Sequence, residues 1–241
     1  MPKNPKPHQR AHAKPRNLPV VQDGPIRKIV RRNHRGFVCL FWSRKSSFPV
    51  ECQSLLELDF VRLSETNRHV TSILHQPREI IWLDGGTKRT HIPDFAVTYR
   101  GAPAIIEVKY SEDAAKPEIV ERTEIVTETL AKEGIVYRVL TEKFIRREPA
   151  LTVAKLLLRG MDHDPSPNDR QAVIELLDQT PQGLEIGQIR TALSKEPVFV
   201  NSVLAMVLSG DLVIHDVGED RDPLDLEPGF LRVCTTKECG N

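Results

Sequence analysis

The sequence predicts an α/β protein, with a mixed β-sheet flanked by helices and a smaller C-terminal unit of helices and strands. Three observations support this fold class. Two runs of strand-forming residues, 91–99 and 104–110, flank a turn at 100–103 and predict a β-hairpin. Apolar residues at helical spacing occur on both sides of this hairpin, in 50–65 and 117–133. Such an order of helix, antiparallel strands and helix favours a sheet covered by helices.

The remaining elements follow from local signals. Residues 70–75 and 78–83 are rich in strand formers, and Asp84-Gly85-Gly86 marks a turn before the next strand. Pro117 lies in the first turn of the helix 117–133, and Gly134 indicates its end. The segment 135–140 reads as a further strand. Helices are expected at 141–147 and 150–159.

The domain organisation changes after residue 160, where a stretch rich in Asp and Pro indicates a linker. Beyond it, three amphipathic helices (169–179, 185–194 and 197–208) and two strands (211–217 and 229–233) form a winged-helix pattern. We therefore divide the chain into five parts. These are a flexible basic arm (1–25), the domain that contains the predicted mixed sheet (26–148), a connecting helix and linker (149–167), a winged-helix-like domain (168–233) and a tail (234–241). The third helix has no Lys or Arg, which favours protein docking over DNA reading by this domain.

Charge is distributed very unevenly along the chain. Residues 1–47 contain twelve Lys or Arg and one acidic residue, a balance of +11, whereas the remainder has a balance of −10. A basic segment of this kind suits phosphate binding, because each cation placed on a phosphate releases counterions; the alternative is a solvated tail without a partner. The expected DNA contacts are Arg27, Lys28, Arg31, Arg32, Arg35, Arg44 and Lys45.

The composition excludes several classes of protein. No apolar run approaches the roughly 18 residues that a membrane span needs. The basic N-terminus is not followed by an apolar stretch, so we expect no secretory signal. The four cysteines show no zinc-finger spacing, and we expect them to be reduced thiols in a cytoplasmic protein.

The predicted hairpin carries a set of charged residues at one edge. Asp94 opens its first strand, and Glu107 and Lys109 lie on the same face near the end of the second. Two carboxylates suit Mg²⁺, which prefers oxygen ligands, and the Val108 backbone carbonyl is a plausible third ligand. Lys109 would position or deprotonate a water, and His91 would contact a phosphate. This arrangement predicts metal-dependent phosphodiester hydrolysis. The alternative is a chance Glu-Lys pair on an exposed hairpin.

Two further polar residues are ambiguous from their spacing. Glu57 follows Ser54-Leu55-Leu56 on the first helix, and spacing alone favours an ordinary solvated glutamate. Gln76 precedes Pro77 in a connection, where a structural role is commoner than contact with water or DNA.

Together these residues spell the PD-(D/E)xK motif and resemble TnsA, the endonuclease subunit of heteromeric transposases. The resemblance covers about 30–145, and the winged-helix pattern extends it to about 233. It rests on four segments in order: Ser54-Leu55-Leu56-Glu57, Gln76-Pro77, His91-Ile92-Pro93-Asp94-Phe95 and Ile106-Glu107-Val108-Lys109. Some members of that family carry Gln where this chain has Glu107.

The resemblance implies a restriction-endonuclease-like core in which Glu57 joins Asp94, Glu107 and Lys109 in the catalytic group. It implies Mg²⁺ as cofactor, with Mn²⁺ as a substitute, and double-stranded DNA at transposon ends as substrate. Cleavage would occur at the 5′ ends, while a TnsB-like DDE transposase cleaves the 3′ ends. A TnsC-like AAA+ regulator would contact the C-terminal region, in the bacterial cytoplasm.

Two alternatives remain at this stage. A stand-alone restriction or repair endonuclease of the same fold would need its own reader of DNA sequence, for which the helix 197–208 is a poor candidate. A non-catalytic DNA-binding scaffold with a degenerate nuclease core is disfavoured, because Asp94, Glu107 and Lys109 are all present.

Overall fold

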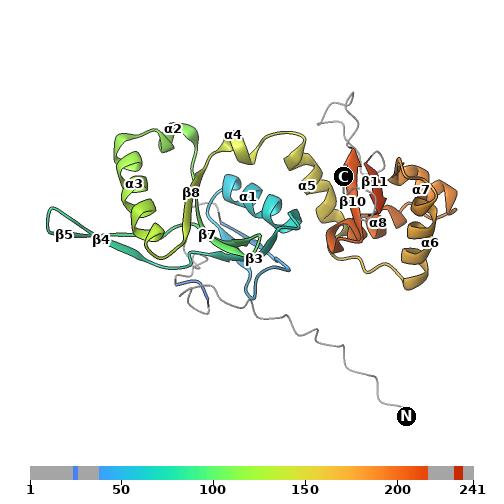
Figure 1. Ribbon diagram of the computed structural model, residues 1–241, viewed down its shortest axis with the longest axis horizontal. Coiled ribbons are helices and arrows are strands. Elements are labelled where there is room, and N and C mark those ends of the chain that lie inside the picture. Colours follow the sequence, from blue (N-terminus) through green and yellow to red (C-terminus); the bar gives the residue numbers. More distant parts are fainter. Residues whose placement is uncertain (1–23, 27–37, 217–230, 236–241) are drawn as a thin grey trace, which may run out of the picture.

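The computed structural model describes residues 24–26, 38–216 and 231–235 (Figure 1). The predicted basic arm lies almost wholly outside these residues. So do five of the expected DNA contacts: Arg27, Lys28, Arg31, Arg32 and Arg35. Among the described residues, no helix is both long and apolar enough to cross a membrane.

A four-stranded mixed sheet forms the centre of the larger part of the molecule. Its strands are β3 (Val70–His75), β6 (Phe95–Tyr99), β7 (Ala102–Val108) and β8 (Val136–Leu140), in the order β3-β6-β7-β8. The first two pairings are antiparallel and the β7–β8 pairing is parallel. A parallel pairing needs a long crossover, which the chain between β7 and β8 supplies with helical structure. The predicted mixed sheet with flanking helices is confirmed.

The β6–β7 hairpin is tighter than predicted. Its turn consists of Arg100 and Gly101 only, both with positive φ (50° and 80°), and Tyr99 already pairs with Ala102. Two successive residues with positive φ are the signature of a two-residue turn whose twist matches that of the strands. The four-residue turn expected at 100–103 is therefore wrong, because Ala102 and Pro103 belong to β7.

Two helices cover opposite faces of this sheet (Figure 1). Helix α1 (Leu55–Thr66) packs on the face that includes Phe95 and Ile106, and α3 (Pro117–Ala131) on the face that includes Ala96 and Ile105. Adjacent residues of β6 and β7 thus serve two separate cores, as alternation along a strand requires. A short helix, α2 (Ser111–Ala114), leads from β7 to α3.

The segment before α1 corrects one prediction. Residues 50–54 are not helical: Val50–Cys52 form β2, which pairs with β1 (Cys39–Phe41). The helix begins only after Ser54, whose hydroxyl accepts a hydrogen bond from the Glu57 backbone N–H (3.0 Å). A side chain that satisfies a free N–H of the first turn fixes where a helix starts.

The chain between β3 and β6 forms a separate two-stranded ribbon. Strands β4 (Ile80–Asp84) and β5 (Thr87–His91) are antiparallel and are joined by Gly85 and Gly86, both with positive φ. Figure 1 shows this ribbon passing beside α3 and projecting beyond the body of the molecule.

The C-terminal part contains three helices and a three-stranded antiparallel sheet. The helices are α6 (Pro167–Asp178), α7 (Ile186–Ala192) and α8 (Phe199–Ser209). The strands β9 (Leu184–Glu185), β10 (Leu212–Asp216) and β11 (Arg232–Thr235) pair in the order β10-β11-β9. Both predicted strands are therefore present, and β9 is an additional short strand that the sequence analysis did not predict.

The segment between the two parts is not a free linker throughout. After α4 (Glu142–Ile145), helix α5 (Ala150–Leu157) contacts both α1 and α8, and the 3-10 helix η1 (Leu158–Gly160) contacts α8. At Gly160 the approach is so close that an added Cβ would lie 2.5 Å from the Ala205 backbone nitrogen. The start of the predicted linker, at Gly160, is thus tightly packed.

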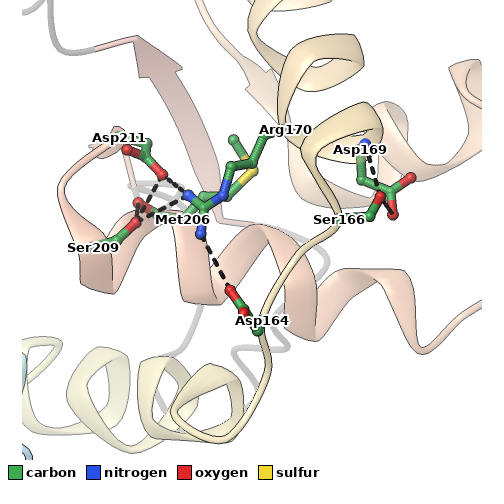
Figure 2. Close-up of polar contacts among 7 residues, drawn as sticks. All are labelled: Asp164, Ser166, Asp169, Arg170, Met206, Ser209 and Asp211. Atoms are coloured by element: carbon green, nitrogen blue, oxygen red, sulfur yellow. Dashed lines mark hydrogen bonds and ion pairs between the residues drawn. The ribbon is translucent and has the colours of Figure 1, made fainter. Parts of the chain in front are cut away.

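A polar network holds the first turn of α6 against the corner between α8 and β10 (Figure 2). Arg170 donates to the carboxylate of Asp211 and lies 3.8 Å from Asp164. The Ser209 hydroxyl lies within hydrogen-bond distance of the same Asp211 carboxylate (2.8 Å) and of the Met206 carbonyl (3.1 Å). These contacts fix the orientation of α6 relative to α8.

The cysteines divide into two kinds. Cys39 and Cys52 are free thiols on the paired strands β1 and β2, as expected. Cys234, by contrast, is disulfide-bonded, so the expectation of a reduced thiol is wrong at this position.

Candidate active site

The three residues of the predicted motif meet at one edge of the central sheet. Asp94 directly precedes β6, and the pairing of Phe95 with Ile106 places it beside Glu107 on the neighbouring strand. The Val108 backbone N–H donates to Asp94 Oδ2 (2.8 Å), and Lys109 Nζ lies 2.9 Å from Glu107 Oε1. The predicted convergence of two carboxylates and an ammonium is therefore present in the structure.

Glu107 is the most enclosed member of this site, with 2% of its surface exposed. Besides Lys109, it is approached by Arg122 of α3 (Nη2 to Oε1, 3.4 Å) and by His91 of β5 (Nε2 to Oε2, 3.1 Å). Burial alone would raise the pKa of Glu107, but the contacts with His91 and Lys109 outweigh it, and the pKa is lowered. Glu107 is thus held as a carboxylate.

Asp94 has the opposite electrostatic environment. Burial, the charge of Glu107 and the charge of Glu57 all raise its pKa, against the weaker opposing effects of the Val108 N–H and Lys109. Three carboxylates therefore lie close enough to repel one another, and a divalent cation among them would relieve this repulsion.

Glu57 occupies the first turn of α1, where its side chain hydrogen-bonds the chain that leads into the helix. Its carboxylate accepts from the Gln53 backbone N–H (2.8 Å) and from the Ser54 hydroxyl (3.1 Å). Burial raises its pKa, and its charge acts on Asp94. The structure thus gives Glu57 a structural role at the helix start and a position close to the catalytic-type carboxylates.

Gln76 supports Asp94 through the backbone. It is buried in a left-handed conformation (φ 42°), and its N–H donates to the Asp94 carbonyl (2.8 Å). This contact fixes the backbone from which the Asp94 side chain projects.

Several buried polar atoms around Glu107 have no hydrogen bond: Glu107 Oε2, His91 Nε2, Arg122 Nε and the Tyr137 hydroxyl. Two of these atoms, His91 Nε2 and Glu107 Oε2, contact each other at 3.1 Å. Tyr137 belongs to the same environment, because burial and the charge of Glu107 raise its pKa. Unpaired buried polar atoms are costly, and their clustering is typical of a site that a ligand or water completes.

The donor set fits a hard divalent cation bound in part by water or phosphate. Among the described residues, no three His, Cys, Asp or Glu side chains are grouped closely enough to enclose a metal by themselves. Mg²⁺ is commonly held by one or two carboxylates together with substrate oxygens and water, which Asp94 and Glu107 can accommodate. A softer metal would require more nitrogen or sulfur ligands than this site offers.

Two of the expected DNA contacts, Arg44 and Lys45, lie within the described residues, and their surroundings differ. Arg44 is exposed. Lys45 instead donates to the carbonyls of Ser64 (2.9 Å) and Asn67 (2.8 Å) at the end of α1, and burial lowers its pKa to about 8. Lys45 therefore caps a helix, and we do not retain it as a DNA contact.

Arg122 and Tyr137 were missed by the sequence analysis. A signal for Arg122 existed, because it follows Ile119 by three and precedes Val126 by four, which places a cation on the inner face of α3. Tyr137 gave no such signal, since an aromatic residue in a buried strand is ordinary.

A comparison with protein-family models identifies residues 67–142 as matching the TnsA-like endonuclease N-terminal family. The match includes Asp94, Glu107 and Lys109 and ends before the C-terminal part; Glu57 precedes it. No curated protein matches the chain. The matched segment contains all four strands of the mixed sheet, with the charged cluster at its edge. Residues 67–142 are thus similar to the N-terminal domain of TnsA-like endonucleases.

Proposed function

We propose that this protein is the metal-dependent endonuclease subunit of a cut-and-paste transposase. The observation that carries the proposal is the meeting of Asp94, Glu107 and Lys109 at one sheet edge within the segment that matches TnsA-like endonucleases. The proposed substrate is double-stranded DNA at the transposon ends, cleaved at the 5′ ends. A TnsB-like DDE transposase would cleave the 3′ ends.

The chemistry assigns a distinct role to each residue. Asp94 and Glu107 would hold Mg²⁺, with Mn²⁺ as a substitute and the Val108 carbonyl as a further ligand. Bound there, the cation would polarise the scissile phosphate and lower the pKa of the attacking water. Lys109 is partly exposed and would orient that water, and Arg122 supplies a second cation for charge that develops on the phosphate.

The C-terminal part is proposed to be a winged-helix domain that docks a protein, with a TnsC-like AAA+ regulator as partner. Helix α8, in the position of a recognition helix, has no Lys or Arg, and Phe199, Val203, Leu204 and Met206 are buried. A helix without cations has no charged contact to offer the phosphates that border the major groove, which disfavours a DNA-reading role. DNA sequence would then be read by the partners.

The test is strand-specific cleavage of a supercoiled plasmid that carries the element's ends. The protein is assayed with Mg²⁺ or Mn²⁺, alone and with its cognate transposase, beside Asp94→Ala and Lys109→Ala. Cutting at the 5′ ends only with the partner, and lost in both variants, is the expected result. Robust site-specific cutting by the protein alone would favour a stand-alone endonuclease. No cutting and no metal binding would refute the nuclease proposal.

A further inference from the structure

The β4–β5 ribbon is an insertion that the sheet itself does not need. Strands β3 and β6 are antiparallel neighbours, and His75 already pairs with Phe95. A turn of a few residues would join them. Instead, the chain makes a ribbon between these positions, which extends past α3 (Figure 1).

The base of the ribbon is fixed to the core and to the candidate site. Ile80 is buried in the core beneath α3. Arg78, just before β4, forms a bidentate ion pair with Glu133 (2.6 and 2.9 Å). At the end of β5, His91 lies 3.1 Å from Glu107. These contacts at both strands set the direction in which the ribbon leaves the site.

The outer part of the ribbon exposes apolar and basic side chains together. Ile81 is 47% exposed and Leu83 75% exposed; the pairing places Leu83 opposite the exposed Lys88. Arg89 is exposed on the other face, where its ion pair with Asp84 (3.2 Å) is solvated and therefore weak. Asp84 is the only acidic residue between 80 and 91. The ribbon is thus locally basic, whereas residues 48–241 as a whole have a charge balance of −10.

We propose that the β4–β5 ribbon is a DNA-contacting arm that lies in the groove beside the scissile phosphate. The inference rests on the proposed nuclease function, because the ribbon ends at His91, beside Glu107, and DNA cleaved there must pass next to it. A two-stranded ribbon fits the major groove, which is about 12 Å wide. Lys88 and Arg89 would contact phosphates, and Leu83 would contact base edges.

The geometry also predicts where the contact occurs. Lys88 precedes His91 by three residues, which corresponds to about 10 Å along an extended strand. At about 3.4 Å per base pair, Leu83 and Lys88 would contact DNA about three base pairs from the cleaved bond.

Site-specific crosslinking provides the first test. Leu83 is replaced by the photocrosslinker benzoylphenylalanine, and the full chain is irradiated with its transposase and end DNA in EDTA, where cleavage is not required. Crosslinks to DNA about three to five base pairs from the 5′ cleavage position are expected. Crosslinks only to the partner protein, or none, would overturn the proposal. If crosslinks to DNA form but the wild type does not cleave in Mg²⁺, the nuclease function would be refuted, while the proposal that the ribbon contacts DNA would stand.

A charge series provides the second test. In Lys88→Ala/Arg89→Ala, the slope of log affinity against log salt concentration should become shallower by about two, in a background of Asp94→Asn. Lys155→Ala, an exposed lysine on α5, is the matched control and should leave the slope unchanged. Equal slopes for the double variant and this control would overturn the proposal. Asp84→Asn, which frees Arg89, should bind at least as tightly as its parent.

Discussion

Replacing Asp94 by Asn should stabilise the metal-free protein while it abolishes cleavage. Burial and the charges of Glu107 and Glu57 raise the pKa of Asp94, so its ionised form is unfavourable in the folded state. Asn removes one of three repelling charges. It also keeps an oxygen that can accept the Val108 N–H, which now donates to Asp94 Oδ2 at 2.8 Å.

The size of the effect follows from these contacts. Relief of a buried, incompletely compensated charge is worth about 1 to 3 kcal/mol. For a chain of this length, each kcal/mol shifts the Tm by about 2 to 4 °C, so an increase of about 2 to 12 °C is expected. Asp94→Ala is the matched control. It removes the same charge but leaves the buried Val108 N–H without an acceptor, so it should gain less than Asn.

The assay is thermal unfolding followed by circular dichroism, in EDTA and in MgCl₂. Mg²⁺ at ten times its Kd should stabilise the wild type by about 1.4 kcal/mol and should not stabilise the variant. A lower Tm for Asp94→Asn than for the wild type in EDTA would refute the idea that the carboxylates repel one another. Equal stabilisation of both proteins by Mg²⁺ would exclude Asp94 as a ligand.

Three further predictions concern single residues. The folded-state pKa of Lys45, about 8, is below its ordinary 10.5, so the unfolded chain binds more protons between these values. The unfolding free energy of the wild type relative to Lys45→Gln should therefore rise from about pH 8 to 10; a flat difference in urea titrations would contradict the burial of Lys45. Gly160→Ala should destabilise by about 1 to 3 kcal/mol, because its Cβ would meet the backbone of α8, and an unchanged Tm would mean looser packing of η1. Arg122→Gln should slow cleavage by about tenfold to hundredfold with partial rescue in Arg122→Lys, and wild-type rates for Arg122→Gln would remove Arg122 from the site.

Much of the fold around the candidate site was predictable because its signals are local. The β6–β7 hairpin follows from two apolar runs around a Gly turn, and α3 follows from Pro117 and the helical spacing after it. The start of α1 was placed wrongly, because the apolar residues of β2 continue into those of the helix. The capping signal was present at Ser54 and Glu57, and it marks the true boundary.

The candidate site was predictable only where neighbouring strands bring its residues together. Asp94 and Glu107 belong to one hairpin, so register alone makes them neighbours. Arg122 reaches Glu107 only through the packing of α3 on the sheet, and the capping role of Lys45 requires the end of α1 to lie beside β1 and β2. Such contacts between distant segments depend on tertiary packing, which spacing along one chain does not specify.

The position of the ribbon between two adjacent strands has a consequence for folding and for evolution. The ends of this insertion are held together by the His75–Phe95 pairing, so its length hardly affects the closing of the sheet. Doubling a flexible insertion costs only about 0.6 kcal/mol in closure entropy. The ribbon can therefore lengthen, shorten or change sequence while the hairpin that carries Asp94 and Glu107 keeps its register. The length and sequence of the ribbon can therefore change during evolution at a different rate from Asp94 and Glu107.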